Sequence, residues 1–250
     1  MNKSINRIRV LAGRNLKEIV RDPLSLIFMV AMPLVMEILF YFIFHTQTAQ
    51  FEMQYLAPGI VAFSQAFLSL FSGILISQDR NTAFLTRLYV SRARSYEFIF
   101  GYAFSLVPIV FVQSLLFFLV GGAIDPSLFS LAMLYGVFLS VITAAFFIGM
   151  GIMIGAVCND KAIGGVASLL ITGQSMLSGM WFPPDGLSKG MKITMKCLPF
   201  KNAGDLIRYH FAPTDGVFGG FVLPLLITLG YVAAAFVVAI LLFRRKMKAN

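Results

Sequence analysis

Long apolar runs alternate with short polar segments along this chain, and the runs have the length of membrane-spanning helices. A helix needs about 20 predominantly apolar residues to cross a bilayer. We predict six such spans, at about residues 24–44, 57–76, 96–120, 128–157, 162–180 and 220–243. Residues 45–56 are predicted to form a polar loop. The pattern predicts an all-α polytopic membrane protein in which residues 23–250 form a single six-helix transmembrane domain.

The segment before the first span, residues 1–22, has the period of an amphipathic helix. At about 100° per residue, its apolar side chains fall within an arc of roughly 80°: Ile5, Ile8, Ala12, Leu16 and Ile19. Its basic residues cluster on the opposite side: Lys3, Arg7, Arg14, Lys17 and Arg21. Such a helix lies in the membrane interface. It can contact lipid headgroups, and it can also offer a docking surface to a partner.

Composition excludes a soluble domain. Hydrophobic residues make up 58% of the 250 residues and charged residues 12%, against about 25% charge in soluble domains. The net charge of +9 indicates positive-inside topology and lipid contact rather than nucleic acid. With six spans, fifteen of the 20 Lys and Arg fall on the side of the N-terminus. We therefore expect both termini to be cytoplasmic, in the plasma membrane of a prokaryotic cell.

Motifs for nucleotide, metal and hydrolytic chemistry are absent from the sequence. A Walker A motif needs a Gly-Lys pair to hold phosphates, and no Gly-Lys pair occurs. His45 and His210 stand alone, which disfavours a membrane-embedded enzyme. Cys158 and Cys197 fall on opposite sides of the predicted membrane and should not pair. We expect no cofactor or metal bound by this chain and no catalytic residue in it.

Glu37 is the carboxylate that we place inside a predicted span, four residues after Pro33. A proline leaves a backbone carbonyl one turn earlier unpaired, so the helix should be irregular there. An ionisable residue within the membrane indicates a functional site. Either Glu37 belongs to a substrate path or gate, or it sits protonated or hydrogen-bonded near the outer interface. The other candidates for such a path or gate are Met176, Trp181 and Phe182.

Small residues in the fourth predicted span indicate close helix packing. Gly151 and Gly155 form a G-x-x-x-G pattern, which lets another helix approach. Ala145 and Gly149 are expected to extend the same face. We favour packing within the chain over a dimer seam.

Two polar segments between spans carry further helical patterns. In residues 77–95, Asn81 can cap a short amphipathic helix from Thr82 to Tyr89, which is either a solvated basic loop or a knob for a cytoplasmic partner. Residues 181–219 carry two short helical patterns after Trp181. Aromatic and apolar residues of this kind suit a membrane interface, so we expect re-entrant or interfacial helices in the outer leaflet.

Taken in order, several fragments resemble the ABC-2-type transporter permeases, the membrane subunits of ABC exporters. Arg21-Asp22-Pro23 is similar to the end of the family's elbow helix. The run from Asp79 to Leu88, followed by Ser91 to Glu97 and Gly101, looks like its coupling-helix loop. Residues Leu177 to Pro183 resemble the motif at the outer end of the fifth span. Leu198-Pro199 and Asp205 to Arg208 match the pattern that follows.

The resemblance implies a division of labour. A separate ABC ATP-binding subunit, present in two copies and carrying ATP and Mg, would dock beneath residues 1–22 and 77–95. A second permease would complete a path for an amphipathic or lipid-like substrate, as in the drug or antibiotic exporters. The residues expected to couple to the ATPase are Arg14, Lys17, Arg21, Asp79, Arg80, Asn81, Thr82, Leu85, Arg87 and Leu88. An ATP-independent secondary transporter is the alternative, although such a protein should show more intramembrane charge.

Overall fold

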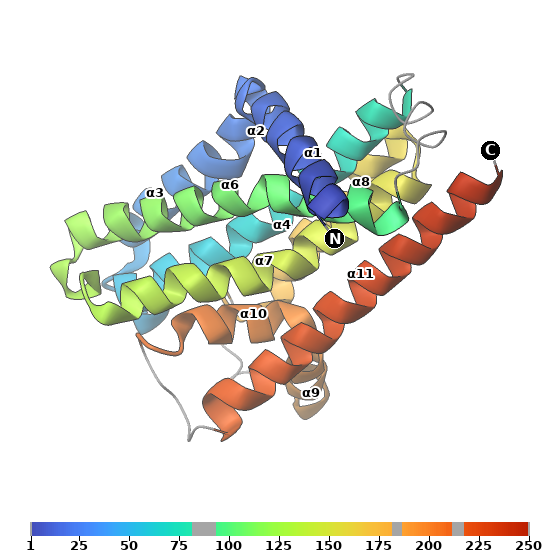
Figure 1. Cartoon of the computed structure of the whole chain (residues 1–250). Coiled ribbons are helices and arrows are strands. Elements are labelled where there is room, and N and C mark those ends of the chain that lie inside the picture. The colour runs from blue at the N-terminus through green and yellow to red at the C-terminus, as the bar shows by residue number, and fades with distance from the viewer. Residues whose placement is uncertain (1, 82–93, 182–186, 212–217, 250) are drawn as a thin grey trace.

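The computed structural model describes residues 2–81, 94–181, 187–211 and 218–249, and every regular element in these ranges is a helix (Figure 1). The all-α prediction is therefore confirmed. In chain order the helices are α1 (Asn2–Val20), α2 (Pro23–Leu26), η1 (Ile27–Ala31), α3 (Met32–Phe44), η2 (Ala49–Phe51), α4 (Met53–Asn81), α6 (Ser95–Ile124), η3 (Pro126–Leu128), α7 (Leu131–Val157), α8 (Asp160–Leu177), α9 (Lys189–Cys197), α10 (Pro199–Arg208), η5 (Phe218–Val222) and α11 (Leu223–Ala249).

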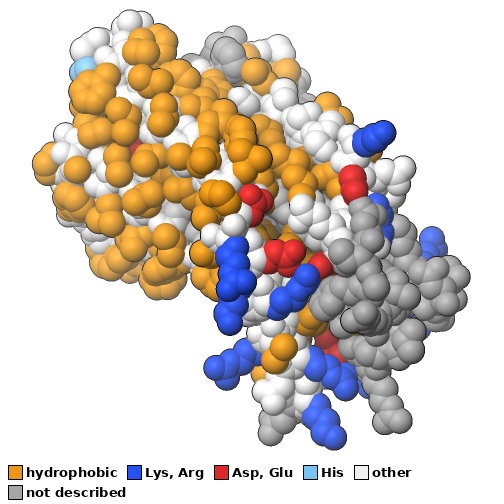
Figure 2. All heavy atoms as spheres, turned by 90° about the horizontal axis from the view of Figure 1, so that it is seen from above, with side chains coloured by type: hydrophobic (Ala, Val, Ile, Leu, Met, Phe, Trp, Pro, Cys, Tyr) orange, Lys and Arg blue, Asp and Glu red, His pale blue; other side chains and the backbone are white. Residues whose placement is uncertain are grey.

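Five stretches of the described residues are long and apolar enough to cross a membrane: Pro23–Phe44, Met53–Arg80, Ser95–Ile124, Leu131–Val157 and Gly220–Arg245. They correspond to the first four predicted spans and the sixth. Figure 2 shows apolar side chains over most of the bundle in that view, with Lys, Arg, Asp and Glu gathered toward one end. The distribution is that of a multi-pass membrane protein, with lipid around the bundle and water at the charged end.

Local sequence explains how the first span begins and where it deviates from α-helix. The Asp22 side chain accepts hydrogen bonds from the Ser25 backbone N–H and hydroxyl, and Pro23 occupies the first helical position. The irregularity expected near Pro33 is present as the π-helical turn η1, where the Met32 N–H donates to the Ile27 carbonyl. The span is thus a chain of three short helical segments.

The predicted polar loop 45–56 is too long, because α4 already begins at Met53. Met53 and Leu56 are buried, whereas Gln54 faces out and donates to the Ser127 hydroxyl at 3.2 Å. The polar residue that suggested a loop therefore lies on the outer face of a helix whose inner face is apolar.

Helix α8 lies where the fifth span was predicted, but it is not among the five apolar stretches. It starts with Asp160 and Lys161 and carries Gln174, so its composition is more polar. Its two ends still contact opposite ends of α4. The Ser77 hydroxyl donates to Asp160, and Met180, just beyond α8, lies beside Gly59. The six-span topology therefore remains a prediction.

Helix α4 lies at the centre of the bundle and packs most closely against α7. A Cβ on Gly151 would overlap the Ser72 hydroxyl and lie 2.7 Å from the Ser69 Cα. A Cβ on Gly155 would lie 2.6 Å from the Gly73 carbonyl oxygen. The G-x-x-x-G pattern thus serves packing within the chain, as favoured from the sequence.

Ala145 and Gly149 do not extend that face, which corrects the prediction. A Cβ on Gly149 would lie 3.0 Å from the Ala235 Cβ of α11, and Ala145 lines an apolar cavity between α6, α7 and α11. Positions 149 and 151 are about 200° apart on a helix at 3.6 residues per turn. The two pairs therefore serve two different helix contacts.

Helices α9 and α10 confirm two short helices in the predicted outer segment. In α9, Met195 is buried while Met191 and Ile193 are exposed. The apolar side chains of α10, including Ala203, Leu206 and Ile207, are buried. Figure 1 shows α10 lying between α7 and α11. Their position in the outer leaflet and a re-entrant path remain predictions.

Substituting Gly151 by alanine should destabilise the close contact between α4 and α7. An added methyl group has no space there, and overpacking of a core costs about 1–3 kcal/mol. The midpoint of thermal unfolding in detergent should therefore fall for Gly151→Ala. The matched control is Gly230→Ala, where nothing lies within 4 Å of the new Cβ and helix propensity favours alanine by up to about 1 kcal/mol. Equal midpoints for the two variants would contradict this packing.

Candidate functional site

Helix α1 is amphipathic, but its buried face is rotated from the predicted one. Leu11, Asn15 and Ile19 are buried, whereas Ile5 is exposed. The rotation follows from contact with α6, because a Cβ on Gly101 would lie 2.8 Å from the Leu11 Cβ. The absence of a side chain at Gly101 lets α1 press closely against α6.

The rotation brings Arg14 onto the buried carboxylate of Asp79 at the end of α4. Arg14 Nη1 and Nη2 each lie 2.6 Å from one Asp79 oxygen, a bidentate ion pair. The Tyr102 hydroxyl of α6 donates to the same carboxylate at 2.7 Å. The hydrogen bond with Asp79 raises the pKa of Arg14. Three helices therefore meet at one carboxylate that is 1% exposed.

A second buried acid, Glu97, joins the start of α6 to the first turn of α1. Arg7 Nη1 lies 3.2 Å from Glu97 Oε2, and the Ser4 hydroxyl donates to Oε1. The Arg94 backbone N–H donates to the same carboxylate at 3.0 Å. Arg7 and Arg14 thus turn toward the bundle, and the predicted free basic cluster on α1 is wrong for these two residues.

The last turn of α4 also holds the connection between α7 and α8. Arg80 Nη2 donates to the Cys158 carbonyl at 2.6 Å, and Nη1 donates to the Ala156 carbonyl at 3.3 Å. These carbonyls end α7, where a cation is favourable. The Ser77 hydroxyl donates to Asp160 in the first turn of α8.

We call Ser77, Asp79 and Arg80 the α4 junction. Within four residues they contact α1, α6, α7 and α8 through charged groups and hydrogen bonds. A displacement of the end of α4 is therefore passed on to four other helices. Of the remaining predicted coupling residues, Asn81 ends α4, and Thr82, Leu85, Arg87 and Leu88 lie outside the described residues.

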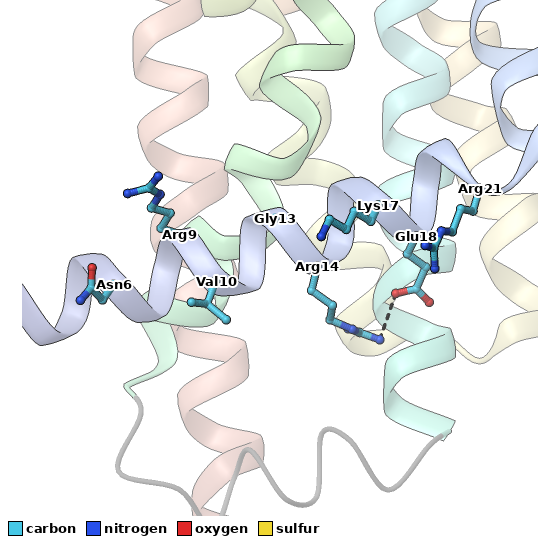
Figure 3. Close-up of a pocket in the computed structure, with 8 residues that line it drawn as sticks. All are labelled: Asn6, Arg9, Val10, Gly13, Arg14, Lys17, Glu18 and Arg21. Atoms are coloured by element: carbon cyan, nitrogen blue, oxygen red, sulfur yellow. Dashed lines mark ion pairs between the residues drawn. The ribbon is translucent and has the colours of Figure 1, made fainter.

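The outward face of α1 borders an open hollow of about 1020 Å³ (Figure 3). Its described lining comes from α1 and the residue directly after it: Asn6, Arg9, Val10, Gly13, Arg14, Lys17, Glu18 and Arg21. Lys17 and Arg21 are exposed here, as predicted for a basic surface. Glu18 forms an ion pair with Arg14, with 2.9 Å between Glu18 Oε2 and Arg14 Nη2. Burial raises the pKa of Glu18. This face is cationic and accessible.

At the other end of the bundle the structure brings Trp181 against the first span. The Trp181 ring lies 4.5 Å from the Phe40 ring and also contacts Phe51 and Phe63. Met176 is exposed on α8, and Phe182 lies outside the described residues.

Glu37 lies one turn from Phe40 and is buried against α6. A Cβ on Gly121 would be 3.0 Å from Glu37 Oε1, with the Met53 sulfur 3.2 Å from the same point. Neither carboxylate oxygen of Glu37 has a hydrogen-bond partner among the described residues. The structure therefore leaves a role for Glu37 in a path or gate as a prediction.

The sequence model of the ABC-2 type transporter family matches residues 6–212, which is most of the chain. The chain belongs to the ABC-2 type transporter family. It is a transmembrane permease component of an ABC transporter. The matched region includes most of α1, the α4 junction and α10. A comparison with curated proteins gives no significant match.

Sequence reasoning missed several residues that hold the permease together at the α1 end. Glu97 was named only within the segment that resembles the family's coupling-helix loop, and Ser77, Tyr102 and Asp160 were not singled out. The sequence carried a signal for Glu97, because it places an acid in the first turn of α6 and a basic amphipathic helix in residues 1–22. Ser77 and Tyr102 gave no such signal, since their roles depend on which helices are neighbours.

Replacing Arg14 by glutamine should destabilise the permease more than replacing Arg21. Arg14→Gln removes the bidentate cation from the buried Asp79 carboxylate. We expect a loss between the ~1 kcal/mol of an exposed pair and the ~3–5 kcal/mol of a fully buried one. Arg21→Gln removes the same charge from an exposed position directly after the same helix. Thermal unfolding midpoints in detergent measure the difference.

The double variant Arg14→Gln/Asp79→Asn provides the second half of this test. It removes both charges, so it should be less destabilised than the sum of the two single variants. Strict additivity would show that the two side chains do not stabilise each other.

Proposed function

We propose that this permease is the membrane half of an ATP-driven exporter. A separate ABC ATP-binding subunit, in two copies per complex, docks beneath α1 and residues 77–95. A second permease, identical or homologous, completes the path. The cargo is an amphipathic or lipid-like molecule moved out of the cytoplasm, as in drug or antibiotic exporters. The N- and C-termini lie in the cytoplasm and the complex in the plasma membrane of a prokaryote.

The α4 junction is the observation that carries this proposal. Residues 82–93 connect α4 to α6, and both flanks of this connection are fixed to α1, through Asp79 on one side and Glu97 on the other. A partner that moves this segment would move α1, α4 and α6 together. Arg80 and Ser77 extend the movement to α7 and α8. This arrangement suits a device that converts closure of an ATPase into helix displacement.

The exposed face of α1 supports docking at the same end. Arg9, Lys17 and Arg21 project from it around the hollow (Figure 3). Such cations attract anionic lipid headgroups and acidic protein surfaces alike. Both contacts fit a helix that lies in the interface beside a cytoplasmic subunit.

Helix α8 supports a second permease. Its buried residues are Ile163, Ala167 and Gln174, so most of the helix faces away from the bundle. Val166 and Leu169 are exposed there. Another copy packed on this face would enclose a path between the two chains.

A secondary transporter is the second candidate, and Glu37 is the observation that favours it. A buried carboxylate without a partner within a span can carry a proton. The other acids that the structure describes inside candidate spans, Asp79 and Glu97, are ion-paired. Proton coupling would then rest on Glu37 alone.

Replacing Leu85 and Leu88 with aspartate should release the ATPase. Burying a leucine against a partner contributes about 1.5–3 kcal/mol, so the double variant should bind at least about tenfold more weakly. Copurification in mild detergent with nucleotide trapping, followed by mass spectrometry, measures the ATPase recovered per permease. The matched control is Met191→Asp/Ile193→Asp, two exposed apolar positions on α9, which should retain the ATPase.

Recovery of the same amount of ATPase with both double variants would refute docking at residues 82–89. Recovery of the wild-type permease alone under every nucleotide condition would favour the secondary transporter. Glu37→Gln should then abolish transport.

A further inference from the structure

Arg208 is the last residue of α10 and lies against the first turns of α4, at the end of the bundle opposite the α4 junction. Its guanidinium carbon is 5.7 Å from the centre of the Tyr55 ring. A Cβ on Gly59 would stand 3.4 Å from Arg208 Nη2 and 3.1 Å from the Met180 Cγ. Tyr55 and Asp79 are 24 residues apart on α4, roughly 36 Å at 1.5 Å per residue.

One nitrogen of the half-buried Arg208 guanidinium has no acceptor within the described part of the chain. Its Nε is buried and has no hydrogen-bond partner among the described residues. It takes part in none of the ion pairs that the described residues form. The neighbouring acid Asp205 is already paired with Lys201. A guanidinium remains charged in proteins and presents five donors, so leaving the buried Nε donor without an acceptor costs free energy.

The walls around Arg208 are held in place by other contacts. Gly179 adopts a positive φ of 74°, a conformation that glycine adopts at little cost. The Gln50 amide donates to the Gly179 carbonyl at 2.9 Å and also to the Met180 carbonyl. Met180 is thereby held over Gly59, and the lack of a side chain at position 59 lets Met180 and the Arg208 guanidinium pack closely against α4. Three separate segments build the surroundings of one cation.

We propose that Arg208 binds the phosphate of a phospholipid in the leaflet at this end of the bundle. A planar guanidinium matches the oxygens of a phosphate with two parallel donors. The half-buried Tyr55 ring beside Arg208 offers aromatic surface to the glycerol and the first methylenes of the chains. Tyrosine is typical of this depth in a membrane. Burial lowers the pKa of Arg208, and Asp205 opposes that shift.

This site belongs to the permease alone, so it does not depend on an ATPase or on export. If it holds, it also favours lipid-like cargo, because a phosphate-bearing amphiphile would meet a cation at the end of its passage. Failure of the ATPase proposal would leave the binding measurement unaffected, and the two results are therefore separable.

The test uses the purified full-length permease in a neutral detergent. Thermal unfolding is followed while phosphatidylglycerol, phosphatidylcholine or inorganic phosphate is added, and an apparent affinity is taken from each titration. Phosphatidylglycerol should stabilise the wild type more than phosphatidylcholine does, because its phosphate carries the only headgroup charge. Arg208→Gln should weaken the apparent affinity for phosphatidylglycerol by about tenfold or more.

Lys196→Gln is the matched control, because it removes the same charge from an exposed position of the same outer segment. It should bind phosphatidylglycerol as the wild type does. An equal loss with Lys196→Gln would reduce the effect to net charge and overturn the assignment. Protection of the wild type by inorganic phosphate, lost in Arg208→Gln, would assign the site to free phosphate instead of a lipid.

Arg208→Lys keeps the charge and guards against a variant that fails to fold. Lysine lacks the planar pair of donors, and the exchange is not conservative at such a site. Its affinity for phosphatidylglycerol should fall several-fold. An affinity equal to the wild type in Arg208→Lys, or in a folded Arg208→Gln, would overturn the proposal.

Discussion

The buried carboxylate of Asp79 is the constraint on which the arrangement of the α1 end depends. A desolvated charge must be paired, and the groups that pair with it come from α1 and α6. Helix α1 therefore cannot tilt or slide without exposing a carboxylate to an apolar surrounding. Glu97 at the start of α6 has the same role, because it is a buried acid paired with Arg7 of α1. The two acids fix the flanks of residues 82–93, so a force applied between them acts on a rigid frame.

Close packing carries that frame into the membrane. Gly73, Gly151 and Gly155 bring α4 and α7 into backbone contact, and contacts this close repack in discrete steps rather than deform smoothly. A displacement at the α4 junction is therefore expected to move α4 and α7 as a unit. Arg80 strengthens this coupling because it holds the last carbonyls of α7 directly. The polar and apolar contacts thus act in the same direction.

Much of the fold could be predicted from the sequence, because apolar length alone identifies helices that cross a bilayer. The start of the first span was also readable, since Asp22 and Pro23 have local roles. The rest depended on neighbours. The orientation of α1 is decided by the space at Gly101 and by Asp79, neither of which is near α1 in sequence. The same holds for Gly149, whose contact with α11 could not be separated from the Gly151 face before the helices were placed. Whether α8 crosses the membrane was harder to predict, because its polar residues give it a composition between that of a span and that of a surface helix.

The charged groups at the two ends of the bundle differ in whether they are paired, and this difference distinguishes structural residues from candidate ligand-binding residues. At the α1 end, Asp79 and Glu97 have partners and hold helices together. At the other end, Glu37 and Arg208 lie near the start of α4 and have no ion-pair partner among the described residues. The free-energy cost of burying Glu37 falls when its carboxylate takes up a proton, because a carboxylic acid is neutral. A guanidinium cannot be neutralised in this way, because it does not lose its proton in proteins. The need for an external partner is therefore stronger at Arg208, and an anion is the partner that satisfies it.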